Sequence, residues 1–163
     1  MFYKQAIYDI LHAHGILYEV TEHPAVFNMA QLSSVPLPYP EADAKNLFVR
    51  DDKRKNYYLL TVRGDQRVDL KAFRKTYGTR PLTFVPPDEL SELLGLIPGA
   101  VSPFGLLNDE ERKVAFYIDR SFLEGSGLVG VHPNDNTATV WLKTEDLLSV
   151  IREHGNEVHT AAL

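Results

Sequence analysis

The alternation of hydrophobic and polar residues along the chain predicts short helices interleaved with short strands. Ala6, Ile7, Ile10 and Leu11 recur at the spacing of one helical face, and Gly15 follows as a stop. Similar periodic runs, bounded by capping and turn residues, extend through the rest of the chain. Helices are expected over residues 3–14, 28–32, 69–77, 88–94 and 144–154, and strands over residues 16–22, 44–51, 57–62, 114–118, 129–131 and 137–142.

The clearest pair of strands is AKNLFVRD, residues 44–51, and YYLLTV, residues 57–62. A short charged turn joins them, so we expect a β-hairpin. The stretch before the hairpin contains Pro36, Pro38 and Pro40, which predicts a loop because it can be neither helix nor central strand. Helices and strands follow one another without the regular period of a doubly wound sheet. We therefore expect an α/β fold in which helices flank a mixed sheet.

Length and composition are those of an ordinary globular protein. With 163 residues, 44% of them hydrophobic and 24% charged, we expect residues 1–163 to form a single domain. No apolar run approaches the roughly 18 residues that cross a bilayer, and the N-terminal segment lacks a signal-peptide core. The sequence contains no cysteine. We expect a soluble cytoplasmic protein with no membrane partner, in which hydrolysis would use water, a hydroxyl or an amine.

Charge is unevenly distributed along the chain. The net charge is −5, yet the segment from Arg50 to Arg80 contains ten Lys or Arg and four Asp, so this segment carries +6 and the remainder −11. A local positive field on an acidic protein suits a partner that is touched at one end, such as the terminus of a folded RNA. The alternative is that these are solvated charges on loops and helix faces.

Lys45 and Asn46 are unusual residues at the beginning of an apolar strand. An ammonium group at this position would be partly desolvated, which strengthens its attraction for a carbonyl or phosphate oxygen. Lys45 is therefore a candidate electrophilic anchor. The alternative is that its aliphatic stem lies along the strand while its amine reaches solvent.

Two further segments are candidates for chemistry. GLIPGAVSPFG, residues 95–105, holds three glycines, two prolines and a serine, and such irregular backbone can direct several N–H groups at one oxygen. The alternative is a tight connection between a helix and a strand. His132 precedes Pro133, which favours an extended conformation before a turn, so its imidazole could face a cleft; a structural histidine is the alternative.

Motifs for metals and nucleotide cofactors are missing from the sequence. No set of His, Asp and Glu shows convincing metal-ligand spacing, and no glycine-rich nucleotide-binding motif occurs. We therefore expect neither a metal nor another cofactor.

Four separated motifs together resemble a known family. EHPAVF (22–27), AKNLFVRD (44–51), the 95–105 loop and HPNDNTATV (132–140) occur in the order found in stand-alone aminoacyl-tRNA editing domains, which include the YbaK proteins. These resemble the editing domain inserted in bacterial prolyl-tRNA synthetase. The resemblance implies an α/β domain around a mixed, partly barrel-like sheet. It also implies hydrolysis of the ester that joins a wrong amino acid to the 3′ adenosine. The family members that this sequence resembles most remove alanine from tRNA(Pro).

The family's functional residues carry over onto matching positions of this chain. The family lysine maps onto Lys45, which stands directly before the Asn-Leu-Phe run, and the histidine of the His-Pro-Asn motif maps onto His132. From this resemblance we hypothesise that a bound water attacks the ester, while Lys45 and the loop amides near Gly99 stabilise the oxyanion. Asn46 and His132 would position the water or the terminal adenosine. The expected catalytic residues are Lys45, Asn46, Gly99 and His132, and the expected substrate contacts are Val26, Phe27, Met29, Pro98, Ser102, Phe104 and Gly105.

Selectivity is expected to come from size, because missing methylenes in an apolar pocket are worth only about 1–3 kcal/mol and a synthetase for proline cannot strongly reject alanine. Val26, Phe27 and Met29 are candidates for the walls, with ordinary core packing as the alternative. Three prolines shortly before Lys45 depart from the family pattern and leave the amino-acid preference open. The expected partner is mischarged tRNA(Pro), bound at its acceptor end, with transient association with prolyl-tRNA synthetase; its contacts are expected at Arg50, Lys71, Arg74 and Lys75.

Two rival functions remain open at this stage. One is a deacylase for cysteinyl-tRNA(Pro), which a comparison of alanyl and cysteinyl substrates would distinguish. The other is a non-catalytic module that binds tRNA ends, which a Lys45→Ala variant would distinguish by its turnover. The sequence leaves the oligomeric state open.

Overall fold

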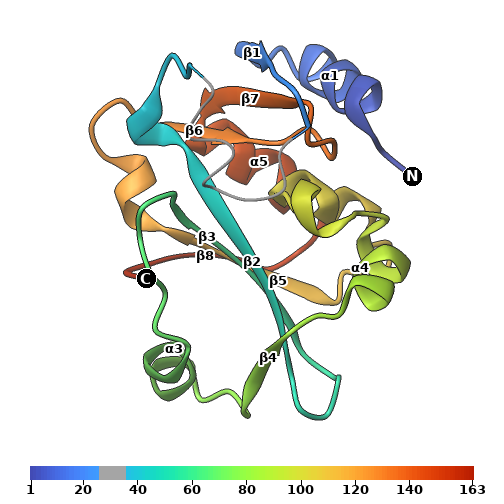
Figure 1. The fold of residues 1–163 in the computed structure, drawn as a ribbon, viewed down its shortest axis with the longest axis vertical. Helices are drawn as coiled ribbons and strands as arrows, with labels where there is room; N and C mark the ends of the chain where they lie inside the picture. The colour runs from blue at the N-terminus through green and yellow to red at the C-terminus, as the bar shows by residue number, and fades with distance from the viewer. Residues whose placement is uncertain (26–35) are drawn as a thin grey trace.

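In the part of the chain that the structure describes, two β-sheets, one of three strands and one of five, form the framework (Figure 1). The computed structural model describes residues 1–25 and 36–163. The three-stranded sheet has the order β1-β7-β6, and the five-stranded sheet has the order β4-β2-β3-β5-β8. The strands are β1 (Tyr18–Glu22), β2 (Ala44–Asp51), β3 (Tyr57–Arg63), β4 (Leu82–Phe84), β5 (Val114–Asp119), β6 (Leu128–Val131), β7 (Ala138–Lys143) and β8 (Val158–Ala161).

The helices begin and end at the capping residues that the sequence offers. Asp69 accepts hydrogen bonds from the first turn of α3, and Gly78, Gly95 and Gly155 end three helices in the left-handed conformation that glycine favours. The α-helices are α1 (Lys4–Ala13), α3 (Leu70–Tyr77), α4 (Pro87–Leu94) and α5 (Thr144–His154), and the 3₁₀ helices are η1 (Pro40–Ala42), η2 (Pro98–Ala100), η3 (Pro103–Asn108) and η4 (Arg120–Leu123).

The five-stranded sheet is mixed, as predicted. β2 pairs antiparallel with β3 in the expected hairpin and with β4, whereas β3 with β5 and β5 with β8 are parallel. The three-stranded sheet is antiparallel throughout. The sequence predicted one sheet, and the structure has two, which meet at a parallel bridge between Asp43 and Gly130. The predicted α/β architecture is confirmed.

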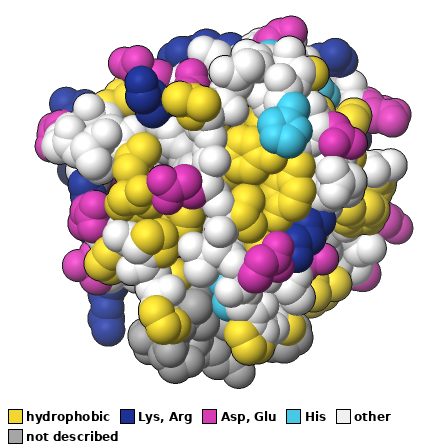
Figure 2. Space-filling model, turned by 90° about the horizontal axis from the view of Figure 1, so that it is seen from above, with side chains coloured by type: hydrophobic (Ala, Val, Ile, Leu, Met, Phe, Trp, Pro, Cys, Tyr) yellow, Lys and Arg dark blue, Asp and Glu magenta, His cyan; other side chains and the backbone are white. Residues whose placement is uncertain are grey.

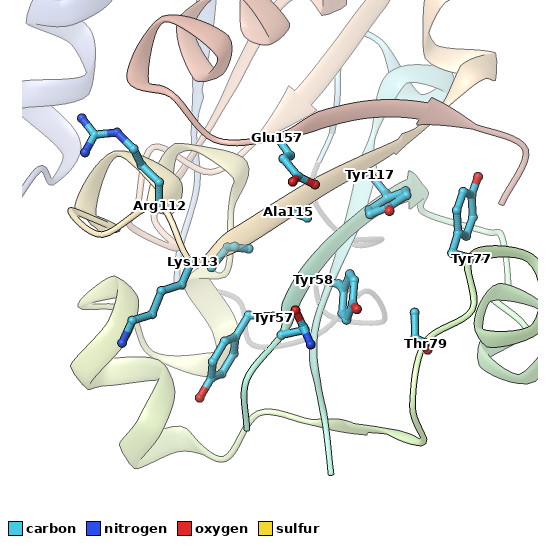
Figure 3. A pocket seen from close by; sticks show the side chains of 11 residues that line it. Tyr57, Tyr58, Tyr77, Thr79, Arg112, Lys113, Ala115, Tyr117 and Glu157 are labelled. Carbon is cyan, nitrogen blue, oxygen red and sulfur yellow. The ribbon is translucent and has the colours of Figure 1, made fainter. Parts of the chain in front are cut away.

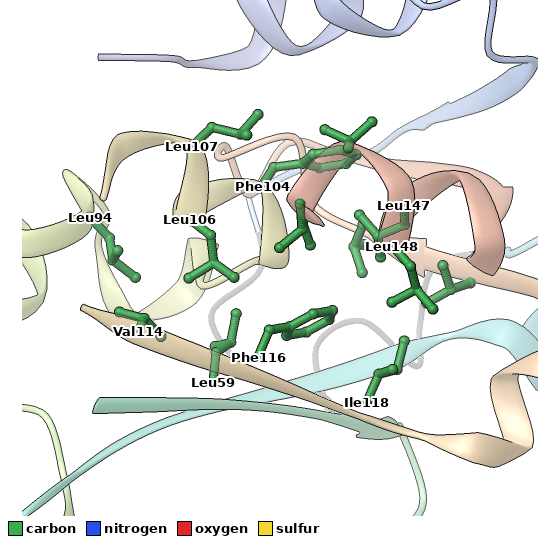
Figure 4. Close-up of a cluster of buried hydrophobic side chains, with 14 of the residues drawn as sticks. Leu59, Leu94, Phe104, Leu106, Leu107, Val114, Phe116, Ile118, Leu147 and Leu148 are labelled. Carbon is green, nitrogen blue, oxygen red and sulfur yellow. The ribbon is translucent and has the colours of Figure 1, made fainter. Parts of the chain in front are cut away.

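Both faces of the five-stranded sheet are covered. One face carries the main hydrophobic core, where Leu59, Phe116 and Ile118 pack beneath η3 and α5 (Figure 4). On the other face α3 packs through Phe73 against Leu60 and its neighbours. Burying each large apolar side chain contributes roughly 1.5–3 kcal/mol, so these two layers stabilise the sheet.

Hydrophobic side chains also gather at the end of the molecule that carries α1 and the three-stranded sheet (Figure 2). There Tyr18 of β1 stacks on Tyr8 of α1 with ring centroids 5.8 Å apart, and His12 lies against Tyr18 at 5.3 Å. These contacts pack the N-terminal helix onto β1.

Two strands were not predicted. β4 has only three residues and β8 has four, of which His159 and Thr160 are polar, so neither shows a hydrophobic alternation long enough to identify. Both lie at the edges of the five-stranded sheet and form only because β2 and β5 offer unpaired backbone groups. The helix predicted over residues 28–32 lies outside the described residues. Within the described part of the chain, no helix is long and apolar enough to span a bilayer.

Candidate functional site at the junction of the two sheets

The bridge between Asp43 and Gly130 brings two predicted site residues level with each other. Partners in a parallel bridge direct their side chains to the same face, and the next side chains on that face are two residues further along each strand. Lys45 stands at this position on β2, and His132 stands at the corresponding position one residue past the end of β6. The register therefore places the lysine and the histidine on one shared face at the junction of the sheets.

Lys45 and Asn46 leave β2 on opposite faces. Lys45 is half-buried, and its Nζ donates a hydrogen bond to the carbonyl oxygen of Gln66 in the loop after β3. The Oδ1 of Asn46 accepts a hydrogen bond of 2.6 Å from Oγ1 of Thr61, its cross-strand neighbour on β3. The structure thus brings Lys45, and not the side chain of Asn46, to the face of His132. Asn46 instead ties the two strands of the hairpin together.

The imidazole of His132 is held in one tautomer. Its Nδ1 lies 2.7 Å from the carbonyl oxygen of Ala138, and because a carbonyl only accepts, Nδ1 carries the proton. Nε2 then bears the lone pair, and it has no hydrogen-bond partner among residues 1–25 and 36–163. Burial lowers the pKa of His132 below its usual value of 6.5, although the hydrogen bond to Ala138 acts in the opposite direction. At pH 7 the ring is neutral and offers an acceptor nitrogen.

A second histidine, His23, packs edge-on against His132 with ring centroids 5.8 Å apart. It is buried, and its Nε2 lies 3.0 Å from Oγ1 of Thr139 on β7. His23 lies within the EHPAVF motif, but no role was predicted for it. A signal was present, because His23 and His132 are the two histidines of the sequence that precede a proline.

The 95–105 loop reaches the same site through Ser102. This residue is fully buried, and its Oγ donates a hydrogen bond of 2.5 Å to the carbonyl oxygen of His132. The same Oγ accepts a hydrogen bond from the backbone nitrogen of Phe104 at 3.2 Å, which caps η3. Gly99 is half-buried in η2, and Pro98 beside it is exposed. The loop and the histidine motif, separate in the sequence, are therefore joined by a direct contact.

Asp43 places a buried carboxyl group on the face of Lys45. It is 8% exposed, and burial raises its pKa to about 7. Its bridge partner Gly130 is covered by the ring of Trp141, so closely that a Cβ at Gly130 would lie 2.2 Å from Cζ3 of Trp141. Only glycine permits this approach. Asp43 was not predicted as a site residue, because an aspartate before a strand is ordinarily a solvated turn residue.

A separate pocket of about 220 Å³ lies on the α3 side of the five-stranded sheet, toward the tip of the β2–β3 hairpin. We call it the tyrosine pocket; it is lined chiefly by Tyr58, Tyr77, Tyr117 and Glu157 (Figure 3). The small side chain of Ala115 on β5 leaves the hollow between the rings. Arg112 and Lys113 also line the pocket, but their side chains extend away from Tyr58, Tyr77 and Tyr117 (Figure 3).

Three predicted site residues have structural roles instead. Arg50 is buried on β2, where its Nε lies 3.1 Å from Oε2 of Glu89 on α4, so it is not available to contact tRNA. Phe104 is fully buried in the main core and does not line an open site. Gly105 allows η3 to approach Leu96, since a Cβ would lie 2.6 Å from Cδ1 of Leu96. Alternation of side chains along β2 explains why Arg50 is buried, because Arg50 lies on the same face of the strand as Phe48 of the main core.

The other predicted contacts lie on α3 or outside the described residues. Lys71, Arg74 and Lys75 are exposed on α3 and remain predicted tRNA contacts. The expected pocket walls Val26, Phe27 and Met29 lie outside the described residues. Among the residues that the structure describes, no group of three or more His, Asp or Glu side chains is arranged to hold a metal ion.

Comparison with known proteins gives a consistent result. The model of the aminoacyl-tRNA editing domain matches residues 23–150. The prolyl-tRNA editing protein ProX of Acetoanaerobium sticklandii is 40% identical over 153 residues, covering 94% of this chain and 93% of that protein. The prolyl-tRNA synthetase associated domain-containing protein 1 of Bos taurus is 34% identical over 157 residues, covering 94% of this chain and 91% of that protein.

The fold agrees with these relationships. A crystal structure of a candidate trans-editing enzyme for prolyl-tRNA synthetase matches with a TM-score of 0.64 and 25% identity, covering 90% of this chain and 87% of that chain. The match of the family model begins at His23 and includes Lys45 and His132. The resemblance inferred from the four motifs is confirmed, and this chain belongs to the aminoacyl-tRNA editing domain family.

Proposed function

We propose that this protein is a trans-editing deacylase that hydrolyses the ester bond of mischarged tRNA(Pro), with alanyl-tRNA(Pro) as the preferred substrate. Membership of the editing family supports the reaction class, and the 40% identity to a prolyl-tRNA editing protein supports the choice of tRNA(Pro). The observation that carries the proposal is the register of the Asp43–Gly130 bridge, which places Lys45 and His132 on one face.

The two side chains have complementary chemistry. A water bound to Nε2 of His132 attacks the carbonyl carbon of the ester and gives up a proton to that nitrogen. Lys45 stabilises the negative charge that develops on the carbonyl oxygen. The bond to the ribose oxygen then breaks, and this oxygen takes the proton from His132, which releases alanine and restores the neutral imidazole.

Lys45 must be able to leave its present partner for this step. Its Nζ donates to the carbonyl oxygen of Gln66, a neutral acceptor in a loop, rather than to a carboxylate. A substrate oxygen that becomes negative competes well with a neutral carbonyl, because hydrogen bonds to charged groups are roughly twice as strong. In this proposal, the amine is held near the ester and moves to it as the charge develops.

The 95–105 loop contributes the second part of the oxyanion site. Ser102 anchors this loop to the carbonyl oxygen of His132, so a movement of the histidine segment also moves the loop. We assign the backbone N–H groups near Gly99 to the developing oxyanion, since glycine lets a substrate approach backbone closely.

Size selection is assigned to Val26, Phe27 and Met29 on the basis of the sequence. A pocket that admits alanine and excludes proline acts as a second sieve for the synthetase. Phe27→Ala should admit larger amino-acid esters, and unchanged selectivity across a panel of charged tRNAs would remove this residue from the wall.

The proposal also assigns a partner and a compartment. The protein binds the acceptor end of tRNA(Pro) and needs no cofactor. Transient association with prolyl-tRNA synthetase supplies the misacylated substrate. The site of action is the cytoplasm. The exposed cations of α3 are assigned to the acceptor stem.

A deacylation assay over alanyl-, cysteinyl- and prolyl-tRNA(Pro) tests the proposed function. We expect hydrolysis of the alanyl ester, and a Lys45→Ala variant should lose about 100- to 1,000-fold in kcat while keeping some tRNA affinity. The matched control is Lys53→Ala, which removes an exposed lysine from the hairpin turn and should leave the rate unchanged. Faster release of cysteine would reassign the substrate. Equal rates for Lys45→Ala and the wild-type protein would reject the enzymatic proposal.

A further inference from the structure

The fold brings the two His-Pro pairs of the sequence into contact. His23 follows β1 and His132 follows β6, and their rings meet edge-on with centroids 5.8 Å apart. In the sheet, β7 lies between β1 and β6, and both histidines are hydrogen-bonded to its first two residues: His132 to Ala138 and His23 to Thr139. A single strand thus sets the position of both rings.

The ring of His23 is fixed on both sides. Its Nδ1 lies 2.9 Å from the carbonyl oxygen of Pro24, and its Nε2 lies 3.0 Å from Oγ1 of Thr139. Because the carbonyl only accepts, Nδ1 is the donor and Nε2 accepts from the threonine hydroxyl. Its backbone N–H also donates to the carbonyl oxygen of Thr137 at 3.0 Å. Both ring nitrogens of His23 are occupied, so this residue is poorly suited to proton transfer.

His132 is constrained less completely by its own hydrogen bonds. Nδ1 is held by the carbonyl oxygen of Ala138, but one hydrogen bond leaves the ring plane able to turn about that contact. The ring of His23 packs against it and blocks this rotation. We infer that His23 is a positioning residue, which holds the imidazole of His132 with Nε2 directed toward the face that it shares with Lys45. The inference rests on the proposed function, in which both side chains act on one ester.

The charges around His132 agree with this role. Burial is the main cause of its lowered pKa, the presence of His23 lowers it further, and Asp135 in the turn before β7 raises it. The titratable groups that shift this pKa are therefore His23 from the end of β1 and Asp135 from the turn, and Lys45 of β2 lies on the same face of the sheet junction. Removing the ring of His23 would admit water and raise the pKa of His132 toward its usual value.

A double-mutant cycle tests the inference in the full-length protein. We expect His23→Ala to lower kcat for alanyl-tRNA(Pro) about tenfold with little change in KM, because a partly misoriented base loses part of its effect. If His23 acts through His132, the His23→Ala/His132→Ala variant should be no slower than His132→Ala alone. Losses that multiply in the double variant would show that the two histidines act independently, and would overturn the inference.

An NMR titration of the histidine ring protons supplies a readout that does not depend on deacylation. In His23→Ala the pKa of His132 should rise, whereas in His23→Phe, which keeps a ring at this position, it should change less. An unchanged pKa of His132 in His23→Ala would contradict the inference even if turnover fell. If the wild-type protein hydrolyses no aminoacyl-tRNA, the proposed function fails, and the titration still decides whether His23 controls His132.

Two controls separate positioning from stability. His14→Ala removes an exposed histidine that pairs with Glu153, and it should change neither kcat nor the titration of His132. His23→Phe fills the same space, so it should fold if His23→Ala does not. A folded His23→Phe variant with the activity and titration expected of His23→Ala would show that hydrogen bonding to Thr139, and not ring packing, positions the site.

Discussion

The two ends of β2 differ in how their buried polar groups are neutralised. At its beginning, Asp43 is buried and His132 is half-buried beside the junction of the sheets, and burial shifts both of their pKa values toward the neutral form. At its end, Arg50 is buried too, but Glu89 neutralises it at 3.1 Å. The charge at the second end is paired, whereas burial holds the two groups at the first end in their neutral forms. We therefore locate chemistry at the junction of the sheets.

The tyrosine pocket lies toward the end of β2 that carries Arg50, and its polar groups also have a structural role. Burial is the main cause that raises the pKa of Tyr58 and of Tyr117, so both hydroxyl groups stay protonated near neutral pH. Tyr117 also stacks on His159 with centroids 4.6 Å apart, and it packs against Phe73 of α3. These aromatic contacts hold α3 on the sheet.

The largest effect is expected from breaking the buried pair at the end of β2. Arg50→Ala should lower the free energy of unfolding by about 3 kcal/mol, because it leaves the carboxylate of Glu89 largely buried without its cation. Urea denaturation measures this loss. The control is Arg80→Ala, which breaks the exposed pair with Asp52 and should leave the midpoint almost unchanged. Similar midpoints for the two variants would contradict a structural role for Arg50.

At the other end, removing His132 should affect catalysis more than stability. His132→Asn should lower kcat by about 100-fold through loss of the acceptor nitrogen. Since burial lowers the pKa of His132, the wild-type enzyme should remain active as the pH falls through 6.5 and lose activity only below that value. Rates of alanyl-tRNA(Pro) hydrolysis between pH 5 and pH 8 check this expectation. If His132→Asn lost activity at acid pH in the same way as the wild-type protein, the loss would belong to the titration of another group.

A smaller effect of the opposite sign is expected from Asp43. Its pKa is about 7 in the folded protein and 3.8 ordinarily, so the folded state holds a proton that the unfolded state has released between these values. Stability should therefore fall as the pH rises from about 4 to about 7. Asp43→Asn should remove this slope and stabilise the protein at pH 8 by on the order of 2 kcal/mol.

Thermal unfolding at several pH values measures the effect of Asp43→Asn. Asp65→Asn, which changes an exposed aspartate in the loop after β3, is the matched control and should keep the wild-type slope. A variant Asp43→Asn that is less stable than the wild-type protein at pH 8 would mean that the ionised carboxyl has a favourable partner.

The smallest effect concerns the exposed cations of α3. Reversing the charge of Lys71, Arg74 and Lys75 together should weaken tRNA binding about tenfold and reduce its dependence on salt, because fewer counterions are released. The measurement is a binding titration at several salt concentrations. Unchanged affinity would remove α3 from the tRNA interface, while Lys45→Ala would still test the chemistry.

Local signals predicted most of the secondary structure. The N-cap at Asp69 and the helix-ending glycines define helices through contacts within a few residues, so the sequence alone places their boundaries. β4 and β8 could not be predicted because three or four residues carry too little pattern, and their pairing depends on β2 and β5. The candidate site was predicted from motifs, yet the structure pairs Asn46 with Thr61 and Arg50 with Glu89, because the face of a strand that is buried depends on what packs there.

The sequence by itself determined the helix ends, the β2–β3 hairpin and the candidate pair Lys45 and His132, since spacing, capping and motif order are properties of neighbouring residues. Only the tertiary structure decided that His23 meets His132, that Asp43 is buried and that Arg50 is neutralised by Glu89. These are contacts between segments far apart in the chain. Their energies depend on burial and on the partner that the fold supplies, neither of which is encoded in local spacing.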